Sequence, residues 1–534
     1  MELDWVYLLP FTVLLVVCGY LLTRNEDDYY RKISISSIPL GFFSPIFLSF
    51  LFRRISSSDF IKTIYDRYAT DRVVGMSDSQ GRVFMLLDPE LIKTVAIKNF
   101  DHFTDRRPSF WNANAKNPKT VMNRTLFTLA GDNWRNMRAT LSPAFTGSKM
   151  RLMFQLVLEC CETMVRHYRE KLNSLDSREF EMKDIFSRFS NDVIATCAFG
   201  IKVDSLKYPH NDFYINGKKI THFQRLSVLL RLVAISSFPK ITDILGVEIV
   251  DRAQLKYISE LIMNAVETKT AKNIDRPDMI HLLIEARKGI LKNQQDSEYN
   301  DGFAVVQESD VGQIQNSFKM TDLDMVAQCL IFLFAGFDTV STCLTFLVYE
   351  LTINTDIQQK LYEEVEQTAK QLDGFPLNYE VLQKMKYMDM CVSESLRLWP
   401  PIAMVDRLCV QNYRVDDGQL QFTIEKGTGV SIPIYGLHRD SRYFPDPERF
   451  DPERFSDDNK ADINMGAYVP FGVGPRNCIG SRFALMEVKA IVFHMLLNFS
   501  FERTNKTPVP MRLMRGTISV TSERDVTVAL KLRK

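Results

Sequence analysis

A cysteine in a glycine-rich loop is the residue of this chain whose type and setting best suit chemistry. Residues 471–480 read Phe-Gly-Val-Gly-Pro-Arg-Asn-Cys-Ile-Gly, and a helix is predicted over residues 481–497, just after Cys478. Glycines let a backbone turn tightly and point its amides at a sulfur atom, and Phe471 can shield that sulfur from water. Amides and a helix N-terminus stabilise a thiolate, which haem iron accepts as an axial ligand. The alternative is a buried cysteine that only packs within the turn.

A second set of polar residues interrupts an apolar helix that is predicted over residues 321–351. Residues 335–339 read Ala-Gly-Phe-Asp-Thr, so a glycine, an acid and a hydroxyl lie within one turn. The structural interpretation is a kink at which Thr339 bonds a preceding carbonyl and Asp338 pairs with a neighbour. From these residues alone, that interpretation and a functional one are both open.

Two further pairs of residues share helical faces. Glu394 and Arg397 are three residues apart in a predicted helix, so their side chains can pair, although such a pair on a surface contributes little. Trp134 and Arg138 are four residues apart and also share a face. A stacked pair on a surface helix is the alternative for them.

These segments resemble the motifs of the cytochromes P450, in the order that the family requires. The cysteine loop matches the haem-binding signature F-G-x-G-x-R-x-C-x-G throughout. Residues 335–339 resemble the oxygen-binding groove, residues 394–397 the E-x-x-R motif, residues 452–455 the P-E-R-F segment, and residues 134–138 the W-x-x-x-R motif. The resemblance runs from about residue 39 to the C-terminus. Locally it is similar to the microsomal clan of insect family 9 and vertebrate 3A-type enzymes.

The resemblance implies a role for each matching residue. Cys478 is then the metal ligand of haem b, Asp338 and Thr339 are the catalytic pair that handles protons and oxygen, and Gly336 leaves room for dioxygen. The residues expected to bind the cofactor, with the arginines and the tryptophan beside the haem propionates, are Cys478, Arg476, Trp134, Arg138, Arg106, Arg407, Phe471, Gly472, Ala335, Gly336 and Gly480. Glu394, Arg397 and Arg454 are expected to form a structural network. Arg454 is preferred to Arg449 for its spacing.

Apolar residues beside these motifs are candidates for the substrate pocket. Ordinary core packing is the default for each of them. They are Leu126, Phe127, Phe334, Phe337, Ala403, Met404 and Val405. A basic face of Arg135, Lys149, Arg151 and Lys489 is also expected around the thiolate side, where it would attract an acidic partner, with ordinary solvated side chains as the alternative.

The predicted fold class is mostly α with small β-sheets (α+β), the cytochrome P450 fold with an N-terminal transmembrane anchor. Helical periodicity covers residues 150–172, 257–272 and 279–287. Strands are expected over residues 73–87, around a turn at 78–81, and over 422–434. One helix is expected to begin near residue 378 and to end at Pro400. The polar stretch 288–319 predicts an exposed, mobile loop.

An uncharged run at residues 5–22 predicts the anchor. The run is just long enough to cross a bilayer. The first basic residues follow it, which places the body on the cytoplasmic side. The resemblance to microsomal enzymes implies that the membrane is that of the endoplasmic reticulum. A cleaved signal peptide is the alternative, but acidic residues precede the run and no small-residue cleavage site follows it. The expected domains are a membrane anchor helix at 1–23 and a haem-containing catalytic domain at 24–534.

Composition excludes several classes of protein. The 66 Lys and Arg residues are balanced by 65 Asp and Glu residues, for a net charge of +1, so no nucleic acid is expected as a partner. Nine cysteines with no C-x-x-C pair argue against a disulfide framework and a structural zinc site. They indicate a reducing compartment.

The resemblance implies a monooxygenase that inserts one atom of O2 into a lipophilic small molecule, such as an insecticide, a plant toxin, or an endogenous lipid or hormone. Electrons would come from NADPH through NADPH–cytochrome P450 reductase, with cytochrome b5 as a further candidate donor. A separate reductase is needed because the chain has no dinucleotide-binding fingerprint. The alternatives are a haem-thiolate isomerase or dehydratase that consumes no O2, and a non-enzymatic haem-binding protein. The intact Asp338–Thr339 pair favours the monooxygenase.

Overall fold

The computed structural model describes residues 27–38, 49, 54–78, 80–107, 120–172, 177–221, 231, 234–235, 241–242, 247–273, 276–289, 302–305, 319–517 and 519–533. The predicted anchor helix at 1–23 lies outside these residues. The description below therefore concerns the body of the chain.

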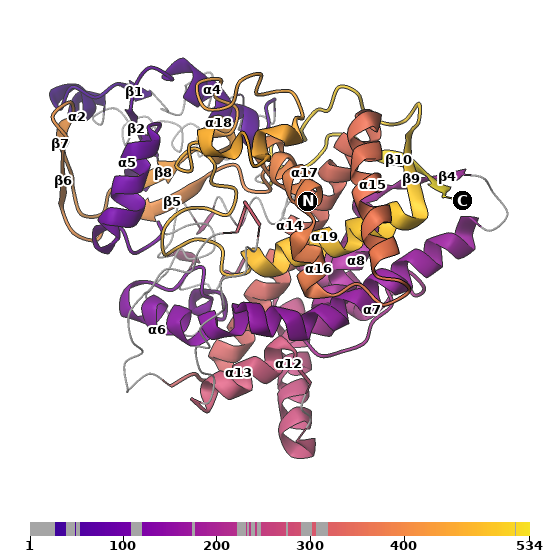
Figure 1. The fold of residues 1–534 in the computed structure, drawn as a ribbon. Helices are drawn as coiled ribbons and strands as arrows, with labels where there is room; N and C mark the ends of the chain where they lie inside the picture. Colours follow the sequence, from indigo (N-terminus) through magenta and orange to yellow (C-terminus); the bar gives the residue numbers. More distant parts are fainter. Residues whose placement is uncertain are drawn as a thin grey trace, which may run out of the picture.

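Helices make up most of the described body and fill the lower and right-hand parts of Figure 1. The α-helices are α2 (Asp27–Lys32), α4 (Ser57–Arg67), α5 (Pro89–Lys93), α6 (Gly131–Leu141), α7 (Gly147–Leu172), α8 (Met182–Cys197), α9 (Asp212–Thr221), α12 (Arg252–Lys272), α13 (Met279–Arg287), α14 (Asp322–Ile353), α15 (Thr355–Gln371), α16 (Tyr379–Lys384), α17 (Lys386–Leu398), α18 (Ile434–Leu437) and α19 (Ser481–Asn498). Short π or 3-10 turns are η1 (Thr94–Lys98), η2 (Phe100–His102), η3 (Met122–Arg124), η4 (Ser142–Phe145), η5 (Pro452–Phe455) and η6 (Lys460–Asp462).

Strands form small sheets, the largest of which lies at the upper left of Figure 1. The strands are β1 (Ser37–Ile38), β2 (Val73–Asp78), β3 (Gly81–Leu86), β4 (Ser177–Glu181), β5 (Val405–Leu408), β6 (Tyr413–Asp416), β7 (Gln421–Ile424), β8 (Gly429–Ile432), β9 (Phe499–Arg503) and β10 (Thr527–Leu532). One sheet has the order β1-β2-β3-β8-β5, another the order β4-β10-β9, and β6 pairs with β7. Parallel pairing of β3 with β8 joins segments that are more than 300 residues apart.

The long helix α14 is the centre of the helical part. Thr321 caps it, because its hydroxyl accepts a hydrogen bond from the Asp324 amide while the Asp324 carboxylate accepts one from the Thr321 amide. The helix packs against α8, α12, α17 and α19. In the described part of the chain, it is the one helix long and apolar enough to span a membrane, with a mean hydropathy of 1.8, but 67% of its most apolar window is buried inside the body. Its hydrophobic character therefore reflects a core position.

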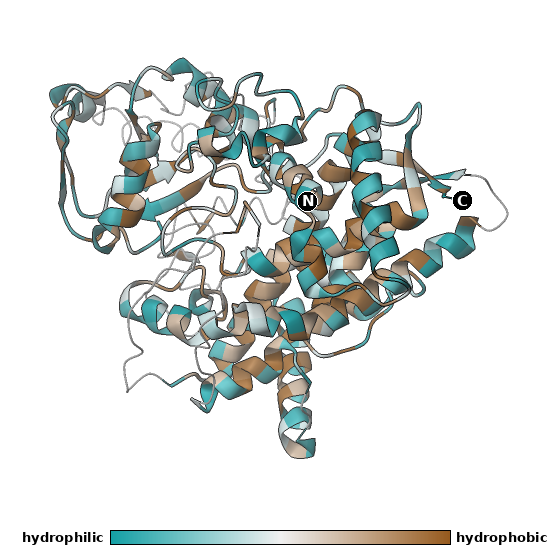
Figure 2. Cartoon of the chain, in the orientation of Figure 1, coloured by the Kyte–Doolittle hydropathy of each residue, from teal (hydrophilic) through white to brown (hydrophobic). Residues whose placement is uncertain are grey.

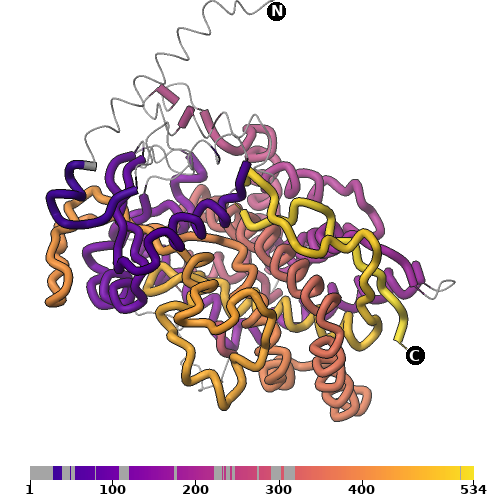
Figure 3. The backbone as a smooth tube through the Cα atoms, turned by 90° about the horizontal axis from the view of Figure 1, so that it is seen from above, coloured from indigo at the N-terminus to yellow at the C-terminus, as the bar shows by residue number. Residues whose placement is uncertain are grey.

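A second hydrophobic cluster lies under the large sheet. Tyr30 is fully buried there, and its hydroxyl accepts from the Val83 amide and donates to the Met76 carbonyl, so it bridges β2 and β3. Seen from above in Figure 3, the orange β6–β7 hairpin lies at the edge beside the indigo N-terminal elements. Figure 2 shows hydrophobic residues where the elements pack together and hydrophilic ones on outward turns.

Most of the predicted elements are confirmed, including the strands on either side of residues 79–80 and the helices α7, α12, α13, α14 and α19. The helix expected from residue 378 to Pro400 is instead two helices. Met385 has φ −73° and ψ 97°, which is extended backbone, so α16 and α17 are separated by a break. The stretch 288–319 is not exposed throughout, because Ala304 is only 3% exposed.

The end of α14 is tied to the end of α17 by a buried carboxyl group. The Trp399 indole N–H donates to Glu350 Oε1 at 2.8 Å, and Glu350 is 5% exposed. Burial raises the pKa of Glu350 to about 7, while the Trp399 hydrogen bond acts in the opposite direction. The folded protein therefore binds a proton at this site that the unfolded chain releases near pH 4.5.

This shift predicts a pH-dependent stability. The contribution from Glu350 is fully present below about pH 4.5 and is lost as the pH rises through about 7, by up to about 3 kcal/mol. A Glu350→Gln variant stays neutral and can still accept from Trp399. Urea unfolding between pH 5 and 8 should therefore show a stability difference, variant minus wild type, that grows with pH. A difference that is constant across this range would contradict the assignment.

Candidate active site

The cysteine loop is shaped by two glycines in left-handed backbone conformations. Gly472 has φ +80° and Gly474 has φ +69°, which other residues rarely adopt. A Cβ on Gly474 would lie 1.9 Å from the carbonyl oxygen of Ala96 in η1. The loop thus sits directly on that turn, and no larger residue fits at position 474 without moving it.

Cys478 is exposed in a loop that is otherwise largely buried. Residues 472–474, Arg476 and Asn477 are buried, whereas Cys478 is exposed and forms no disulfide. The Cys478 amide donates to the Phe471 carbonyl at 2.9 Å, and α19 begins three residues later. This arrangement is the predicted thiol ahead of a helix N-terminus, and it opens the sulfur to a ligand.

Two residues hold this loop from outside. Arg138 donates to the Asn477 carbonyl at 2.9 Å and to the Asn477 side-chain oxygen at 2.8 Å, both within the core. His438 is fully buried, and burial lowers its pKa to about 3. The ring is therefore neutral, with Nδ1 facing the Arg397 carbonyl and Nε2 accepting from the Val469 amide at 2.9 Å. His438 was not predicted, because its partners lie about 30 and 40 residues away.

Three guanidinium groups gather beside the loop, as expected for Arg106, Arg407 and Arg476. Arg407 is fully buried on β5, and its Nε has no hydrogen-bond partner. Burial, reinforced by the charge of Arg106, lowers the pKa of Arg407 to about 9. Burial and then the charges of Arg106 and Arg407 also lower the pKa of Arg476 well below its usual range. The site thus concentrates positive charge at a cost that bound anionic groups would relieve.

The other contacts of these cations are aromatic rings, backbone carbonyls and one carboxylate. Arg476 lies 4.1 Å over the ring of buried Trp134 and donates to the Leu129 carbonyl at 2.7 Å. Arg106 lies 4.4 Å over the ring of Phe127 and reaches Asp406 at 3.2 Å. The structure thus brings together the tryptophan and arginines that were singled out in the sequence.

The face of α14 at residues 335–339 is continuous helix. Ala335 is exposed in the middle of a largely buried helix, and Thr339 is partly exposed. The Thr339 hydroxyl donates to the Ala335 carbonyl, four residues earlier. A Cβ on Gly336 would lie 2.6 Å from Ile194 Cδ1. The absent side chain of Gly336 therefore makes room for Ile194 of α8. That Gly336 also leaves room for dioxygen stays a prediction.

A lysine that was not predicted binds this face. Lys183, in the first turn of α8, donates to Asp338 Oδ1 at 2.8 Å and lies within 2.7–2.8 Å of the hydroxyls of Ser341 and Thr342. Both partners of the ion pair are partly exposed, at 27% and 34% for their side chains. Asp338 is therefore paired, as the structural interpretation of the motif proposed. The Lys183–Asp338 ion pair could not be predicted from the sequence, because Lys183 lies 155 residues before its partner.

The Glu394–Arg397 pair is a core feature. Both side chains are 0% exposed, with Arg397 Nε donating to Glu394 Oε2 at 2.7 Å and Nη2 to Oε1 at 2.8 Å. Arg454 Nε lies 3.4 Å from Glu394 Oε1, whereas Arg449 contributes only its carbonyl, as an acceptor for Arg397. The structure thus assembles the expected triad around Arg454.

The candidate pocket residues separate into two groups. Phe127, Met404 and Val405 are partly exposed, and Phe127 lies against Arg106. The others are core residues: Leu126 (8% exposed), Phe334 (8%), Phe337 (4%) and Ala403 (3%). Phe337 packs toward Tyr214 of α9, with ring centroids 6.0 Å apart, and so does not lie on the face that carries Ala335.

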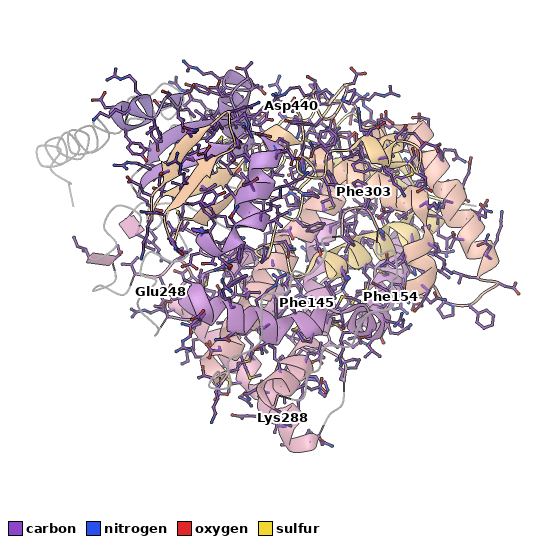
Figure 4. The ribbon with its side chains drawn as sticks, turned by 60° about the vertical axis from the view of Figure 1, so that its left-hand side comes forward. Phe145, Phe154, Glu248, Lys288, Phe303 and Asp440 are labelled. Atoms are coloured by element: carbon purple, nitrogen blue, oxygen red, sulfur yellow. The ribbon has the colours of Figure 1, made fainter. Side chains whose placement is uncertain are left out.

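An aromatic contact beneath the site was missed. Phe145 in η4 packs on Phe332 of α14 with ring centroids 5.6 Å apart. A Cβ on Gly480 would be 3.8 Å from its ring. Figure 4 labels Phe145 near the start of the yellow helix α19. This ring thus spans the gap between the cysteine loop and α14.

The expected basic face is largely neutralised. Lys489 is 0% exposed and lies 2.7 Å from Asp389, so its place on a surface was predicted wrongly. Arg135 pairs with Asp101 at 2.7 Å, Lys149 with Glu285 at 3.7 Å, and Arg151 with Glu380. The sequence around each lysine or arginine does not reveal its acidic partner, because the partner lies on another element.

Comparison with known proteins decides the family. The family model described as Cytochrome P450 matches residues 39–528. The chain belongs to the cytochrome P450 family. It is 39% identical to "Cytochrome P450 9e2" of Blattella germanica over 99% of this chain and 98% of that protein. It is 38% identical to "Cytochrome P450 9b2" of Drosophila melanogaster, with 94% of each covered, and 33% identical to "Cytochrome P450 3A9" of Rattus norvegicus, with 96% and 93% covered.

These relatives confirm the predicted clan of insect family 9 and vertebrate 3A-type enzymes. Membership makes this P450 a haem-dependent monooxygenase, an oxidoreductase. The α-rich body with small sheets is also that of the family.

The residues present in this P450 fit a haem. Cys478 offers one open thiol, and the described residues contain no group of three His, Cys, Asp or Glu side chains that could hold a metal ion by themselves. A haem needs only one axial ligand from the chain for its iron. Arg407, whose Nε has no hydrogen-bond partner, and Arg476 are buried cations that an anion nearby would stabilise. The two propionates of a haem would supply such anions.

The two arginines of the repeated Pro-Glu-Arg-Phe sequence should respond differently to mutation. Arg454→Met removes one positive partner of buried Glu394 and should lower the free energy of unfolding by about 1–3 kcal/mol. Arg449→Met leaves the backbone acceptor in place at an exposed position and should stay within about 0.5 kcal/mol of wild type. Denaturant midpoints of the two variants measure the difference. Equal midpoints would exclude Arg454 from the network.

Proposed function

We propose that this P450 oxidises lipophilic small molecules at the endoplasmic reticulum membrane, with electrons from NADPH delivered by NADPH–cytochrome P450 reductase. Cytochrome b5 is a candidate for a second electron donor. The observation that carries the proposal is the exposed Cys478 thiol beside a cluster of three arginines and the open face of α14. The substrate class extends to xenobiotics such as insecticides and plant toxins and to endogenous lipids or hormones.

Each residue of the site has a proposed part. Cys478 would bind the haem iron, and Arg106, Arg407 and Arg476 would hold the propionates, with Trp134 as the flat support for Arg476. When bound, haem supplies the activation of O2. Arg138 acts one step away, since it holds the cysteine loop through Asn477. Glu394, Arg397 and Arg454 fix the core behind the loop.

Proton handling is assigned to Asp338 and Thr339. The Asp338 carboxylate is partly exposed, at 34% for its side chain, so it is in contact with solvent as well as with Lys183. The Thr339 hydroxyl lies on the face that carries exposed Ala335. To donate toward that face, this hydroxyl must leave the Ala335 carbonyl, which costs one intrahelical hydrogen bond of about 1 kcal/mol.

The substrate is proposed to lie against Phe127, Ala335, Thr339, Met404 and Val405. These residues are partly or fully exposed although neighbouring positions are buried. Their surfaces are mainly apolar, which suits a lipophilic substrate held by few polar contacts. The proposed organisation of the chain is an anchor at 1–23 and a catalytic body at 24–534, with the body on the cytoplasmic face.

Isotope incorporation tests the reaction class. With reductase, NADPH and a lipophilic probe substrate under 18O2, the product should contain one 18O atom and NADPH should be consumed. An isomerase or dehydratase would convert its substrate without NADPH and without label.

Asp338→Asn should lower the amount of product formed per NADPH consumed and raise the amount of hydrogen peroxide released, because protons arrive more slowly at the site. Asp458→Asn, the same change at an exposed residue outside α14, is the matched control and should behave as wild type.

A further inference from the structure

Residues 302–305 are a docked segment in the connection between α13 and α14. The connection starts after Arg287 and ends at Asp322. Figure 4 shows Phe303 well separated from Lys288, which follows α13. Residues 302–305 therefore lie well apart from the end of α13, where they contact Asp389 of α17 and Lys489 of α19.

The segment packs in a socket formed by Asp389, Lys489, Phe455 and Tyr468. The ion pair between Asp389 and Lys489 is the polar part of this socket. The Phe303 amide donates to Asp389 Oδ2 at 2.8 Å, and Asp389 Oδ1 lies 2.7 Å from Lys489 Nζ. Gly302 has φ +103°, and a Cβ there would lie 2.3 Å from Asp389 Oδ1 and 3.0 Å from Lys489 Nζ. The backbone of the segment thus lies directly on the ion pair, at a distance that only glycine permits.

Aromatic rings form the apolar part of the socket. The Phe303 ring lies 4.9 Å from that of Phe455 and 5.4 Å from that of Tyr468, between ring centroids. Ala304 is 3% exposed, and the Val305 amide donates to the Gly302 carbonyl at 3.3 Å, which closes a turn. The segment thus fills the space between α17, α19 and η5 with a compact turn.

The socket is continuous with the cysteine loop. The Tyr468 ring stacks on His438, with centroids 5.4 Å apart, and its hydroxyl donates to the Ser393 carbonyl of α17. His438 accepts from the Val469 amide, the Val469 carbonyl accepts from the Gly472 amide, and the Phe471 carbonyl accepts from the Cys478 amide. Only two residues separate Tyr468 from Phe471.

A second connection runs through α19. Lys489 belongs to the helix that starts just after Cys478, and it is bound on α17 by Asp389. Asp389 in turn receives the amide of Phe303. Side chains that contact the docked segment therefore lie on both sides of the cysteine loop, Tyr468 before it and Lys489 in the helix after it.

We propose that residues 302–305 position the thiolate loop, with Phe303 as a positioning residue that acts through Tyr468 and with Asp389–Lys489 as the anchor. The proposal rests on the function proposed for Cys478 as haem ligand. When the segment leaves its socket, Tyr468 and Lys489 lose a packing partner. The loop then holds Cys478 less firmly in the position from which it would bind the haem iron.

The test uses the full-length, haem-loaded protein and the variants Phe303→Ala, Phe303→Leu and Asp389→Asn. Phe375→Ala is the matched control, because Phe375 is 75% exposed. The first measurement is the rate at which the reduced carbon monoxide complex converts from the long-wavelength thiolate band to the short-wavelength band, well below the unfolding temperature. Phe303→Ala should convert about 5- to 30-fold faster than wild type. Phe303→Leu should recover most of the loss, and Phe375→Ala should match wild type.

The second measurement is amide hydrogen exchange, which requires no activity. Peptides that cover residues 302–305 should be protected in wild type and should lose protection in Asp389→Asn, which keeps the size of the side chain. Phe303→Leu and Asp389→Asn keep the test open if Phe303→Ala does not fold.

The outcomes separate this inference from the proposed function. A wild-type protein that binds no haem, or shows only the short-wavelength band, would contradict the proposed function. A stable thiolate band in wild type that is equally stable in all three variants would contradict the positioning role alone. Exchange of residues 302–305 as fast as in an unstructured peptide would show that the docked contact does not persist in solution, and would also overturn the inference.

Discussion

The close contact between the cysteine loop and η1 is the constraint on which the rest of the site depends. Gly474 lies so near the Ala96 carbonyl that a single added carbon would overlap it. This contact fixes the distance between the cysteine loop, which carries Cys478, and η1 in the N-terminal part of the chain. Hydrogen bonds from Arg138 and to His438 then hold the loop laterally. Cys478 itself is exposed, whereas Arg476 and Asn477 beside it are buried.

Buried charge is the second constraint, and it is resolved in two different ways. Around Glu394, positive and negative groups are paired inside the core, so the network supports the fold without further ligands. Around Arg407 and Arg476, cations are buried with little negative charge, and burial, reinforced by the charges of neighbouring arginines, lowers their pKa values. A network that is complete by itself is structural, whereas an incomplete one indicates where an anionic ligand binds.

Much of the fold and the site could be predicted from the sequence because the signals are local. The periodicity of α7 and α14, the glycines of the cysteine loop and the three-residue spacing of Glu394 and Arg397 all act within one element. Several features could not be predicted. The Lys183–Asp338 pair, the burial of Lys489 and the docking of residues 302–305 each join segments far apart in the chain. A polar composition correctly indicates a connection, but it carries no information about where four of its residues pack.

The break at Met385 and the position of Gly336 show a related limit. Both residues lie in stretches with clear helical character. Met385 nevertheless has extended backbone, and a Cβ on Gly336 would overlap Ile194 of α8. Side-chain size at such positions is set by the opposing element, which a single sequence does not identify.

The most direct test of the account is the carbon monoxide difference spectrum of the reduced protein, compared between wild type, Cys478→Ala and Cys160→Ala. Cys160 lies on α7, is partly buried, and is a matched control for loss of a thiol. The account predicts a long-wavelength Soret band in wild type and Cys160→Ala and its loss in Cys478→Ala. A folded wild-type protein without that band, or a Cys478→Ala variant that retains it, would contradict thiolate ligation by Cys478.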